Sequence, residues 1–175
     1  MFEIIIKTKR LLIRNLTKDD VSTDYLNWLR NKDNLKFIVS ANETNTLENL
    51  QNYVEKKSLK KDIIFLGIFD LQTNLHIGNV KFEPVDIIKK YAVMGILIGN
   101  NEYKGIGIAE EVLTNTFQFL YQKFHINMFL LGVNKNNIPA IKAYNKMGFR
   151  KSNSHILKPK STDAIIMEFK IPNHC

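Results

Sequence analysis

Two apolar stretches, separated by a glycine-containing turn and a long amphipathic stretch, restrict the fold of this chain more than any other feature. Residues 91–99 are mostly apolar, Gly105 and Gly107 follow, and apolar residues then recur every three or four positions as far as Phe124. This recurrence is typical of a helix with one buried face, and a second apolar stretch follows at 127–133. We therefore predict a strand, a helix from about residue 105 to 124 and another strand. Strands joined through a helix lie parallel in one sheet, so the predicted class is α/β, of the α+β type.

The remaining elements are predicted from apolar periodicity and from residues that start or stop helices. Thr17 followed by Asp20 has the pattern of a capping box and predicts a helix that begins at Thr17. Gly148 predicts the end of a helix over 137–147, because glycine readily adopts the left-handed conformation found there. Another helix is expected over 46–60, and strands over 3–7, 10–14, 63–70, 76–82, 149–157 and 164–171. The expected fold is one domain, residues 1–175, with a mixed, mostly antiparallel sheet of about seven strands flanked by about four helices.

Length and composition argue against several classes of protein. The chain has 175 residues, is 45% hydrophobic, and has no apolar run near the roughly 20 residues that a membrane-spanning helix needs. Its one cysteine, Cys175, allows neither a disulfide framework nor a cysteine metal site within the chain. We expect a cytoplasmic protein without metal, signal peptide or membrane contact. The net charge of +8 favours anionic ligands. The lysines are dispersed, which argues against nucleic acid and leaves two alternatives, a phosphate-rich cofactor or a solvated lysine surface without a ligand.

The turn before the long helix has the composition of a phosphate-binding turn. Glycines allow the backbone to approach a ligand closely, and the first N–H groups of a helix have no partner within it. Together with the positive end of the helix dipole, such groups bind phosphate. A tight turn without a ligand explains the glycines equally well. The dinucleotide and Walker A patterns do not fit, because Glu110 replaces the third glycine and no Gly-Lys-Ser/Thr follows. The turn consists of Lys104, Gly105, Ile106, Gly107, Ile108 and Ala109.

A second segment, residues 137–149, combines a capped helix with an aromatic residue. Asn137 is placed to cap the helix, Pro139 lies in its first turn, and Tyr144 follows two turns in. Taken alone, Tyr144 fits a core aromatic residue with a solvated hydroxyl group.

The two segments, in this order and spacing, resemble those of the GNAT acetyltransferase superfamily. Residues 104–109 resemble its Gln/Arg-x-x-Gly-x-Gly/Ala turn, and the resemblance is strongest over 91–149. The stretch Asn-x-x-Ala-x-x-x-Tyr-x-Lys-x-Gly-Phe is matched at every position, by Asn137, Ala140, Tyr144, Lys146, Gly148 and Phe149. Residues 8–14, 25–29, 76–80 and 94–96 resemble the subfamily that includes ribosomal-protein N-terminal and amino-sugar acetyltransferases.

This resemblance implies direct transfer of an acetyl group from acetyl-CoA to a primary amine, without a covalent enzyme intermediate. It assigns the pyrophosphate of acetyl-CoA to the turn 104–109, and the pantetheine arm and thioester carbonyl to the backbone N–H groups of Ile96, Leu97 and Ile98. Asn137 would bind acetyl-CoA near its reactive end. Tyr144 would protonate the departing thiolate as general acid, since its ordinary pKa near 10 keeps the hydroxyl protonated at neutral pH. The family also suggests a homodimer.

The sequence departs from the family pattern at two positions. Lys104 replaces glutamine or arginine, and its charge suits a phosphate. Val93 stands where members that use a glutamate base often carry it, so the amine must lose its proton elsewhere. The alternatives are Glu83, Asp86, His76 or a chain of water molecules, and Glu83 is our candidate for a catalytic carboxylate.

The resemblance leaves the identity of the acceptor open. The missing glutamate, with residues 77–86 and 95–99, favours an amino-sugar nucleotide of surface polysaccharide biosynthesis, whose diphosphate the surplus lysines would suit. The alternatives are the N-terminus of a ribosomal or other protein, and a catalytically silent acyl-CoA-binding domain. Candidates for the acceptor side are Trp28, Arg30, Phe37 and Asn42, although Trp28 also fits the core.

Overall fold

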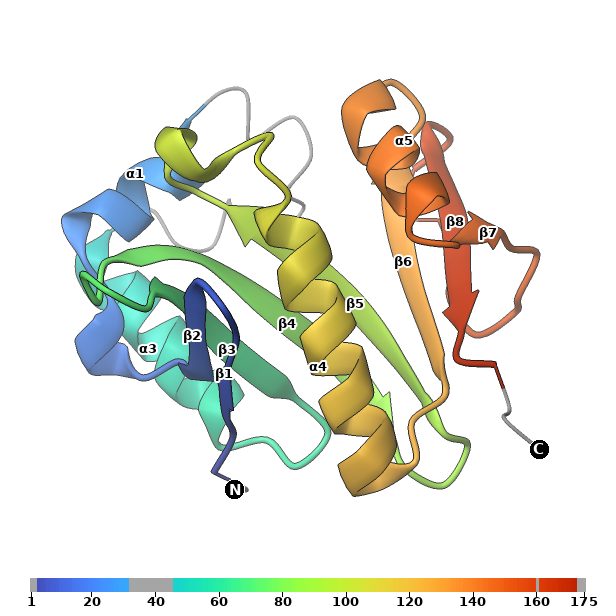
Figure 1. Cartoon of the computed structure of the whole chain (residues 1–175), viewed down its shortest axis with the longest axis horizontal. Coiled ribbons are helices and arrows are strands. Elements are labelled where there is room, and N and C mark those ends of the chain that lie inside the picture. Colours follow the sequence, from blue (N-terminus) through green and yellow to red (C-terminus); the bar gives the residue numbers. More distant parts are fainter. Residues whose placement is uncertain (1–2, 32–45, 160, 173–175) are drawn as a thin grey trace.

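The computed structural model describes residues 3–31, 46–159 and 161–172, which form one mixed sheet with helices on both faces (Figure 1). The spatial order of the strands is β1-β2-β3-β4-β5-β6-β8-β7. Within this described part of the chain, β5 and β6 are parallel and all other neighbours antiparallel. The predicted class and the mostly antiparallel sheet are confirmed, with eight strands for the about seven expected. The strands are β1 (Ile5–Lys7), β2 (Leu11–Asn15), β3 (Ile64–Asp70), β4 (His76–Asp86), β5 (Tyr91–Ile98), β6 (Met128–Asn134), β7 (Arg150–Lys151) and β8 (Ala164–Lys170).

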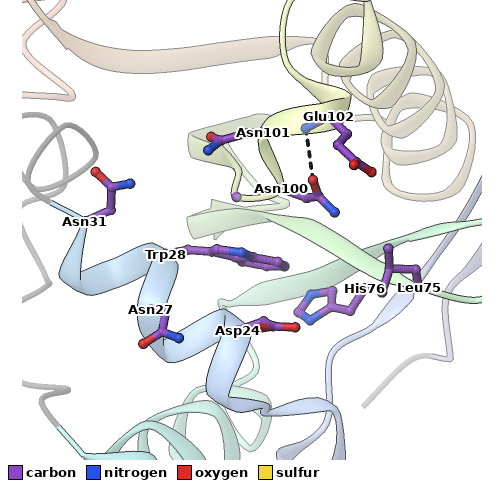
Figure 2. A pocket seen from close by; sticks show the side chains of 10 residues that line it. Asp24, Asn27, Trp28, Asn31, Leu75, His76, Asn100, Asn101 and Glu102 are labelled. Carbon is purple, nitrogen blue, oxygen red and sulfur yellow. Dashed lines mark hydrogen bonds between the residues drawn. The ribbon is translucent and has the colours of Figure 1, made fainter.

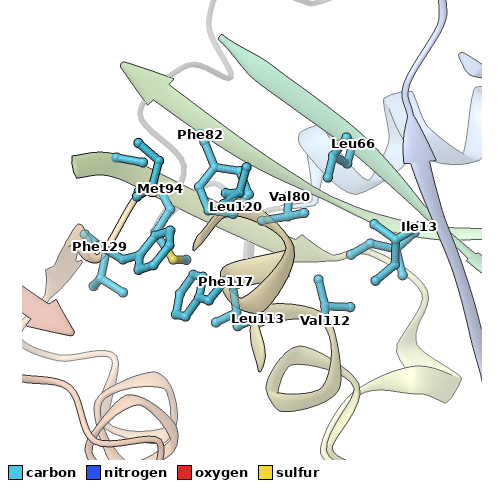
Figure 3. Close-up of a cluster of buried hydrophobic side chains, with 14 of the residues drawn as sticks. Ile13, Leu66, Val80, Phe82, Met94, Val112, Leu113, Phe117, Leu120 and Phe129 are labelled. Atoms are coloured by element: carbon cyan, nitrogen blue, oxygen red, sulfur yellow. The ribbon is translucent and has the colours of Figure 1, made fainter. Parts of the chain in front are cut away.

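The α-helices divide between the two faces of the sheet. On one face, α4 packs on the central strands, and the Phe117 ring stacks on that of Phe129 with centroids 3.8 Å apart (Figure 3). α5 packs against the same core. On the other face, α1 and α3 enclose a second core in which Leu50 and Val54 are fully buried. The helices of the described residues are α1 (Thr23–Arg30), α3 (Leu47–Ser58), α4 (Ile108–Phe124) and α5 (Ile138–Lys146).

The N-terminal helix begins later than predicted. The expected contact between Thr17 and Asp20 forms, with the Thr17 N–H donating to Asp20 Oδ2 at 2.8 Å, but it closes only a short 3-10 turn, η1 (Lys18–Asp20). The chain is extended at Val21 and Ser22. Ser22 then caps α1 by accepting a hydrogen bond from the Tyr25 N–H at 3.2 Å. Two consecutive caps therefore give a turn and a separate helix, where one helix from Thr17 was predicted.

The long helix is also shorter than predicted, and the cause lies in its glycines. Gly105 and Gly107 have φ values of +75° and +81°, left-handed conformations that a right-handed helix does not contain. The helix α4 therefore begins at Ile108 rather than near Gly105. Gly148, with φ of +98°, follows α5 in the left-handed conformation that was predicted for it.

The strand predicted over 149–157 is reduced to the two residues of β7. Directly after it, the Ser152 hydroxyl donates to Glu168 at 2.5 Å and accepts from the Ser154 N–H at 3.0 Å. The Ser154 hydroxyl in turn accepts from the Ile156 N–H at 3.2 Å. Serine side chains thus offer the backbone local partners that compete with a strand ladder, and the chain turns instead of continuing along β8.

Candidate active site

The parallel strands β5 and β6 separate after three paired positions, at the centre of the sheet (Figure 1). Pairing joins Tyr91–Val93 to residues 128–130, and among the described residues β5 continues to Ile98 along β4 alone. The Gly99 N–H donates to the Ile77 carbonyl of β4 at 2.9 Å. Backbone groups alternate in direction along a strand, so the N–H groups of Ile96 and Ile98 point away from β4. These two amides face the side from which β6 has withdrawn, whereas that of Leu97 faces β4.

The predicted phosphate turn lies where β5 leads into α4. A short 3-10 turn, η3 (Asn101–Tyr103), connects β5 to residues 104–107, which are all exposed. The Glu111 N–H donates to the Gly107 carbonyl at 3.1 Å. The N–H groups of residues 108–110 precede this bond and therefore have no partner within the helix. The turn thus presents free amides and a helix N-terminus beside the separating strands, the geometry that suits a pyrophosphate.

A contact from the N-terminal hairpin supports this turn. Arg10, between β1 and β2, forms an ion pair with Glu111 of α4 at 2.6 Å and donates to the Ile106 carbonyl at 3.1 Å. The Thr8 hydroxyl donates to the same carboxylate at 2.5 Å. Burial alone would raise the pKa of Glu111, but the hydrogen bonds from Thr8 and Arg10 outweigh it and hold the pKa below its usual value. The sequence gives no local signal for this contact, because its partners lie far apart in the chain.

The second predicted segment approaches the same turn from the other side. Lys146 of α5 pairs with Glu110, in the first turn of α4, at 2.9 Å. Asn137 caps α5 through its Oδ1, which accepts a hydrogen bond from the Ala140 N–H at 3.3 Å. Tyr144 is half-buried, and its ring lies 5.4 Å from that of Phe149. Burial raises the pKa of Tyr144 to about 12, so its hydroxyl stays a proton donor well above neutral pH.

Glu83 lies on the opposite face of the sheet, within an ionic cluster that we define by Tyr53, Lys57, Lys81 and Glu83. Its carboxylate pairs with Lys57 and, at 2.7 Å, with Lys81, which also donates to the Tyr53 hydroxyl at 2.6 Å. Burial would raise the pKa of Glu83, but the hydrogen bonds from the two lysines outweigh it and lower the pKa. A carboxylate held in this way has a low proton affinity, which is unfavourable for a general base.

The other proton acceptors named from the sequence are also engaged or covered. The Asp86 carboxylate accepts hydrogen bonds from the Ile88 and Lys89 N–H groups at 3.1 and 2.8 Å. Burial lowers the pKa of His76 to about 4, and both ring nitrogens are covered without a hydrogen-bond partner in the described residues.

The face of the sheet that carries α1 and α3 is exposed at one point of β5, beside the ionic cluster. Leu97 packs against the core of that face, and side chains alternate along a strand, so Val93 and Gly95 belong to the same face. Gly95 is exposed and lies in register with Lys81, and a Cβ atom at Gly95 would meet nothing within 4 Å. The exposed surface at Gly95 therefore lies on the face of the sheet opposite α4.

The remaining sequence candidates divide between described and undescribed residues. Trp28 lies in an aromatic group, with its ring 5.1 Å from His76 and 5.7 Å from Tyr25, and Arg30 is exposed at the end of α1. Phe37, Asn42 and Cys175 lie outside the described residues. Across residues 3–31, 46–159 and 161–172, no three His, Cys, Asp or Glu side chains are grouped to hold a metal. Over the same ranges no helix combines the length and apolar character needed to cross a membrane.

A sheet opened between two parallel strands, with a glycine turn and a helix N-terminus at the opening, defines an acyl-CoA-binding class of α/β domain. The family model for the acetyltransferase (GNAT) domain matches residues 10–150, and the chain belongs to this family. It is 28% identical over 124 residues to the SPbeta prophage-derived uncharacterized N-acetyltransferase YokL of Bacillus subtilis. That match covers 70% of the chain and 64% of YokL, so the chain spans less than two thirds of this relative.

Solved structures share the fold. The ribosomal-protein acetyltransferase RimL in complex with coenzyme A superposes with a TM-score of 0.81 and 18% identity, over 96% of this chain and 98% of RimL. The microcin C7 self-immunity acetyltransferase MccE, in complex with acetyl-CoA and AMP, gives a TM-score of 0.77 and 18% identity over 94% of both chains. At these identities the likeness concerns the fold.

Proposed function

We propose that this chain is an acetyl-CoA-dependent N-acetyltransferase that transfers the acetyl group directly to a primary amine. The observation that carries the proposal is the meeting of two sets of backbone amides that have no partner among the described residues. The N–H groups of Ile96 and Ile98 face the space between β5 and β6. Those of the first turn of α4 lie at the end of the same space, where Lys104 adds a positive charge. An extended acyl carrier with a pyrophosphate at one end and a carbonyl at the other fits this arrangement.

Acetyl-CoA supplies an activated thioester carbon, and the residues of the chain act around it. The amine nitrogen forms a bond to that carbon while the carbon–sulfur bond breaks. The amides of Ile96 and Ile98 would donate hydrogen bonds to the carbonyl oxygen as it gains negative charge. The Tyr144 hydroxyl would give its proton to the departing sulfur, which a pKa of about 12 permits throughout the neutral range. Asn137 retains its amide NH2 for acetyl-CoA, because only its oxygen is used to cap α5.

The proton of the amine passes to water in this proposal. Glu83, our first candidate for the base, is a carboxylate paired to two lysines with a lowered pKa. Asp86 holds a turn, and the nitrogens of His76 are covered. With Val93 at the position of the family's glutamate, the amine would enter as the free base, having lost its ammonium proton to solvent. The second proton, which leaves the nitrogen as the amide forms, would pass through water and restore the Tyr144 hydroxyl.

For the acceptor we propose an amino-sugar nucleotide, of the kind used in surface polysaccharide biosynthesis. Lys57 and Lys81 outnumber Glu83 in the ionic cluster, which leaves a surplus positive charge beside the exposed surface at Gly95. A diphosphate is a natural partner for that charge. The presence of AMP in the MccE complex supports a nucleotide-bearing ligand on this fold.

The likeness to RimL favours a second candidate, the N-terminal amine of a protein. The third candidate is an acyl-CoA-binding domain without catalytic activity. Val93, in place of the family's glutamate base, favours it, whereas the presence of the proposed acid Tyr144 argues against it. Assembly as a homodimer remains a prediction from the family resemblance, and a cytoplasmic location remains a prediction from the composition of the chain.

An acceptor screen tests the proposal directly. The chain is incubated with acetyl-CoA and one of four amine classes: amino-sugar nucleotides, N-terminal peptides, polyamines and aminoglycosides. Release of free CoA thiol is then measured. We expect release with an amino-sugar nucleotide, abolished when the amino group of that compound is replaced by hydroxyl. Release only with peptides would transfer the acceptor assignment to a protein N-terminus. Thermal stabilisation by acetyl-CoA without release on any amine would contradict the enzymatic proposal.

A further inference from the structure

A pocket of about 400 Å³ lies between α1, the start of β4 and the residues that follow β5 (Figure 2). Its lining includes the carboxylates of Asp24 and Glu102, which come from α1 and η3, and several asparagine amides. The volume is within the range of small-molecule sites. The acetyl transfer proposed above does not use this pocket, although Trp28 in its lining was a sequence candidate for the acceptor side.

The charge of the pocket is opposite to that of the chain. The chain carries a net charge of +8, yet none of the residues lining the pocket is a lysine or an arginine. His76, the remaining ionisable residue of the lining, is neutral near pH 7 because burial lowers its pKa to about 4. Within the described part of the chain, neither Asp24 nor Glu102 forms an ion pair. The pocket therefore offers two uncompensated negative charges to a ligand.

One wall of the pocket is a fixed aromatic ring. The Trp28 indole lies directly on Gly99, where a Cβ atom would come within 1.9 Å of the ring. Its other neighbours include Tyr25 and His76, with ring centroids 5.7 and 5.1 Å away. Figure 2 shows the indole between Asn100 and Asn101 above and Asp24 below. Among aromatic side chains, the indole face attracts organic cations most strongly.

The walls favour an organic cation over a metal ion. Leu75, which is 43% exposed, adds an apolar surface on which an alkyl chain can rest. Mg²⁺ and Ca²⁺ seek several oxygen ligands and gain nothing from an indole or a leucine. An ammonium group on an aliphatic stem uses all of these features at once: carboxylates, amide oxygens, an aromatic face and an apolar contact.

We propose that this pocket binds an aliphatic ammonium ion, with the charge between Asp24, Glu102 and the Trp28 ring and the stem against Leu75. The ligand would contact η3, which leads directly into the phosphate turn at Lys104. Asp24 and Glu102 are not among the residues assigned to the thioester, so an amine bound between them would be held without being acetylated.

Trp28 is the one tryptophan of the chain, so its fluorescence reports on the pocket directly. The full chain, without acetyl-CoA, is titrated near neutral pH with 1,5-diaminopentane and with its fully N-methylated, non-acetylatable analogue. We expect a saturable change in Trp28 emission with both compounds. The double variant Asp24→Asn, Glu102→Gln should bind both about tenfold more weakly, because two charge contacts are lost.

The matched control is Glu48→Gln, which removes one charge from an exposed residue of α3 outside the pocket. Its binding curve should equal that of the unmodified chain, and thermal melting of all variants checks that they remain folded. Three results would overturn the proposal: no saturable change in emission, an unchanged affinity in the folded double variant, or a response to the diamine but not to the methylated analogue. Because acetyl-CoA is absent, none of these results depends on the acetyltransferase proposal.

Discussion

The Arg10 guanidinium and the Glu111 carboxylate meet at 2.6 Å, although they are 101 positions apart in the chain. The Arg10 side chain is 41% exposed and that of Glu111 only 16%, so the pair lies at the surface with its acidic partner sheltered. Through Ile106, to whose carbonyl Arg10 donates at 3.1 Å, the pair also holds the middle of the phosphate turn. The N-terminal hairpin is thus a structural support of the proposed acetyl-CoA site.

Replacing Arg10 should therefore affect acetyl-CoA more than the acceptor. For Arg10→Met we expect a loss of about 1 kcal/mol in the free energy of unfolding, the size of a well-formed surface pair. We also expect a several-fold rise in the KM for acetyl-CoA with little change in the KM for the amine. Denaturant unfolding and steady-state kinetics measure the two effects. Lys9→Met, which removes an exposed charge beside Arg10, is the control, and an equal effect in that variant would contradict the assignment.

The same contact predicts a specific dependence of stability on pH. The folded-state pKa of Glu111 lies below the ordinary value of about 4.3, because the hydrogen bonds from Thr8 and Arg10 outweigh the effect of burial. The stabilisation is thus fully present above the unfolded pKa and disappears as the pH falls through the folded pKa. The unfolding free energies of the wild type and Glu111→Gln should differ by a constant amount from roughly pH 6 to 8, and the difference should shrink below about pH 4. A difference independent of pH would show that Glu111 acts by shape alone.

Two glycines provide a matched pair of substitutions. Gly107 has a φ of +81°, so Gly107→Ala should cost about 1 kcal/mol of stability and raise the KM for acetyl-CoA. Gly95 has room for a Cβ atom and belongs to a regular strand, so Gly95→Ala should leave stability within about 0.5 kcal/mol of the wild type. Gly95 is exposed on the face of α1 and α3, where the acceptor is proposed to bind, so its substitution should raise the KM for the amine instead. Thermal melts with separate titrations of both substrates distinguish these outcomes.

Local patterns in the sequence predict the order of the elements and both segments proposed to bind acetyl-CoA, because glycine turns, caps and apolar periodicity involve residues close together in the chain. The positions of Lys104–Ala109 and Asn137–Phe149 beside one opening follow from these patterns and the family resemblance. Two predicted elements were wrong for local reasons. The helix expected from Thr17 begins later because Ser22 supplies a second cap, and the strand expected over 149–157 is short because the Ser152 hydroxyl accepts a hydrogen bond from the backbone of a turn. The Arg10–Glu111 pair, the ionic cluster at Glu83 and the Trp28 pocket join distant segments, so no periodicity or motif marks them.

Tyr144→Phe tests the proposed general acid. The substitution removes only the hydroxyl group of a half-buried ring, so the fold and the affinity for acetyl-CoA should change little. We expect kcat to fall by about 10²-fold or more, the contribution typical of a positioned acid. Tyr121→Phe, in α4, is the control and should keep full activity. Since the pKa of Tyr144 is about 12, its hydroxyl stays protonated below about pH 10, and activity should not fall there through ionisation of Tyr144. A Tyr144→Phe variant with wild-type kcat would remove the residue from the reaction.

Glu83→Gln separates a structural carboxylate from a base. In the folded chain the pKa of Glu83 is lowered by Lys57 and Lys81, so Glu83 is ionised across the whole neutral range. Its titration therefore cannot cause the reaction rate to change with pH in that range. If the amine loses its proton to water, kcat/KM for the acceptor should rise with pH and level off near the pKa of the amine itself. The Glu83→Gln variant should keep that profile, retain kcat within a few-fold, and lose about 1 kcal/mol of stability because two half-buried lysines lose their partner. Loss of turnover at every pH in a variant that remains folded would instead make Glu83 the base.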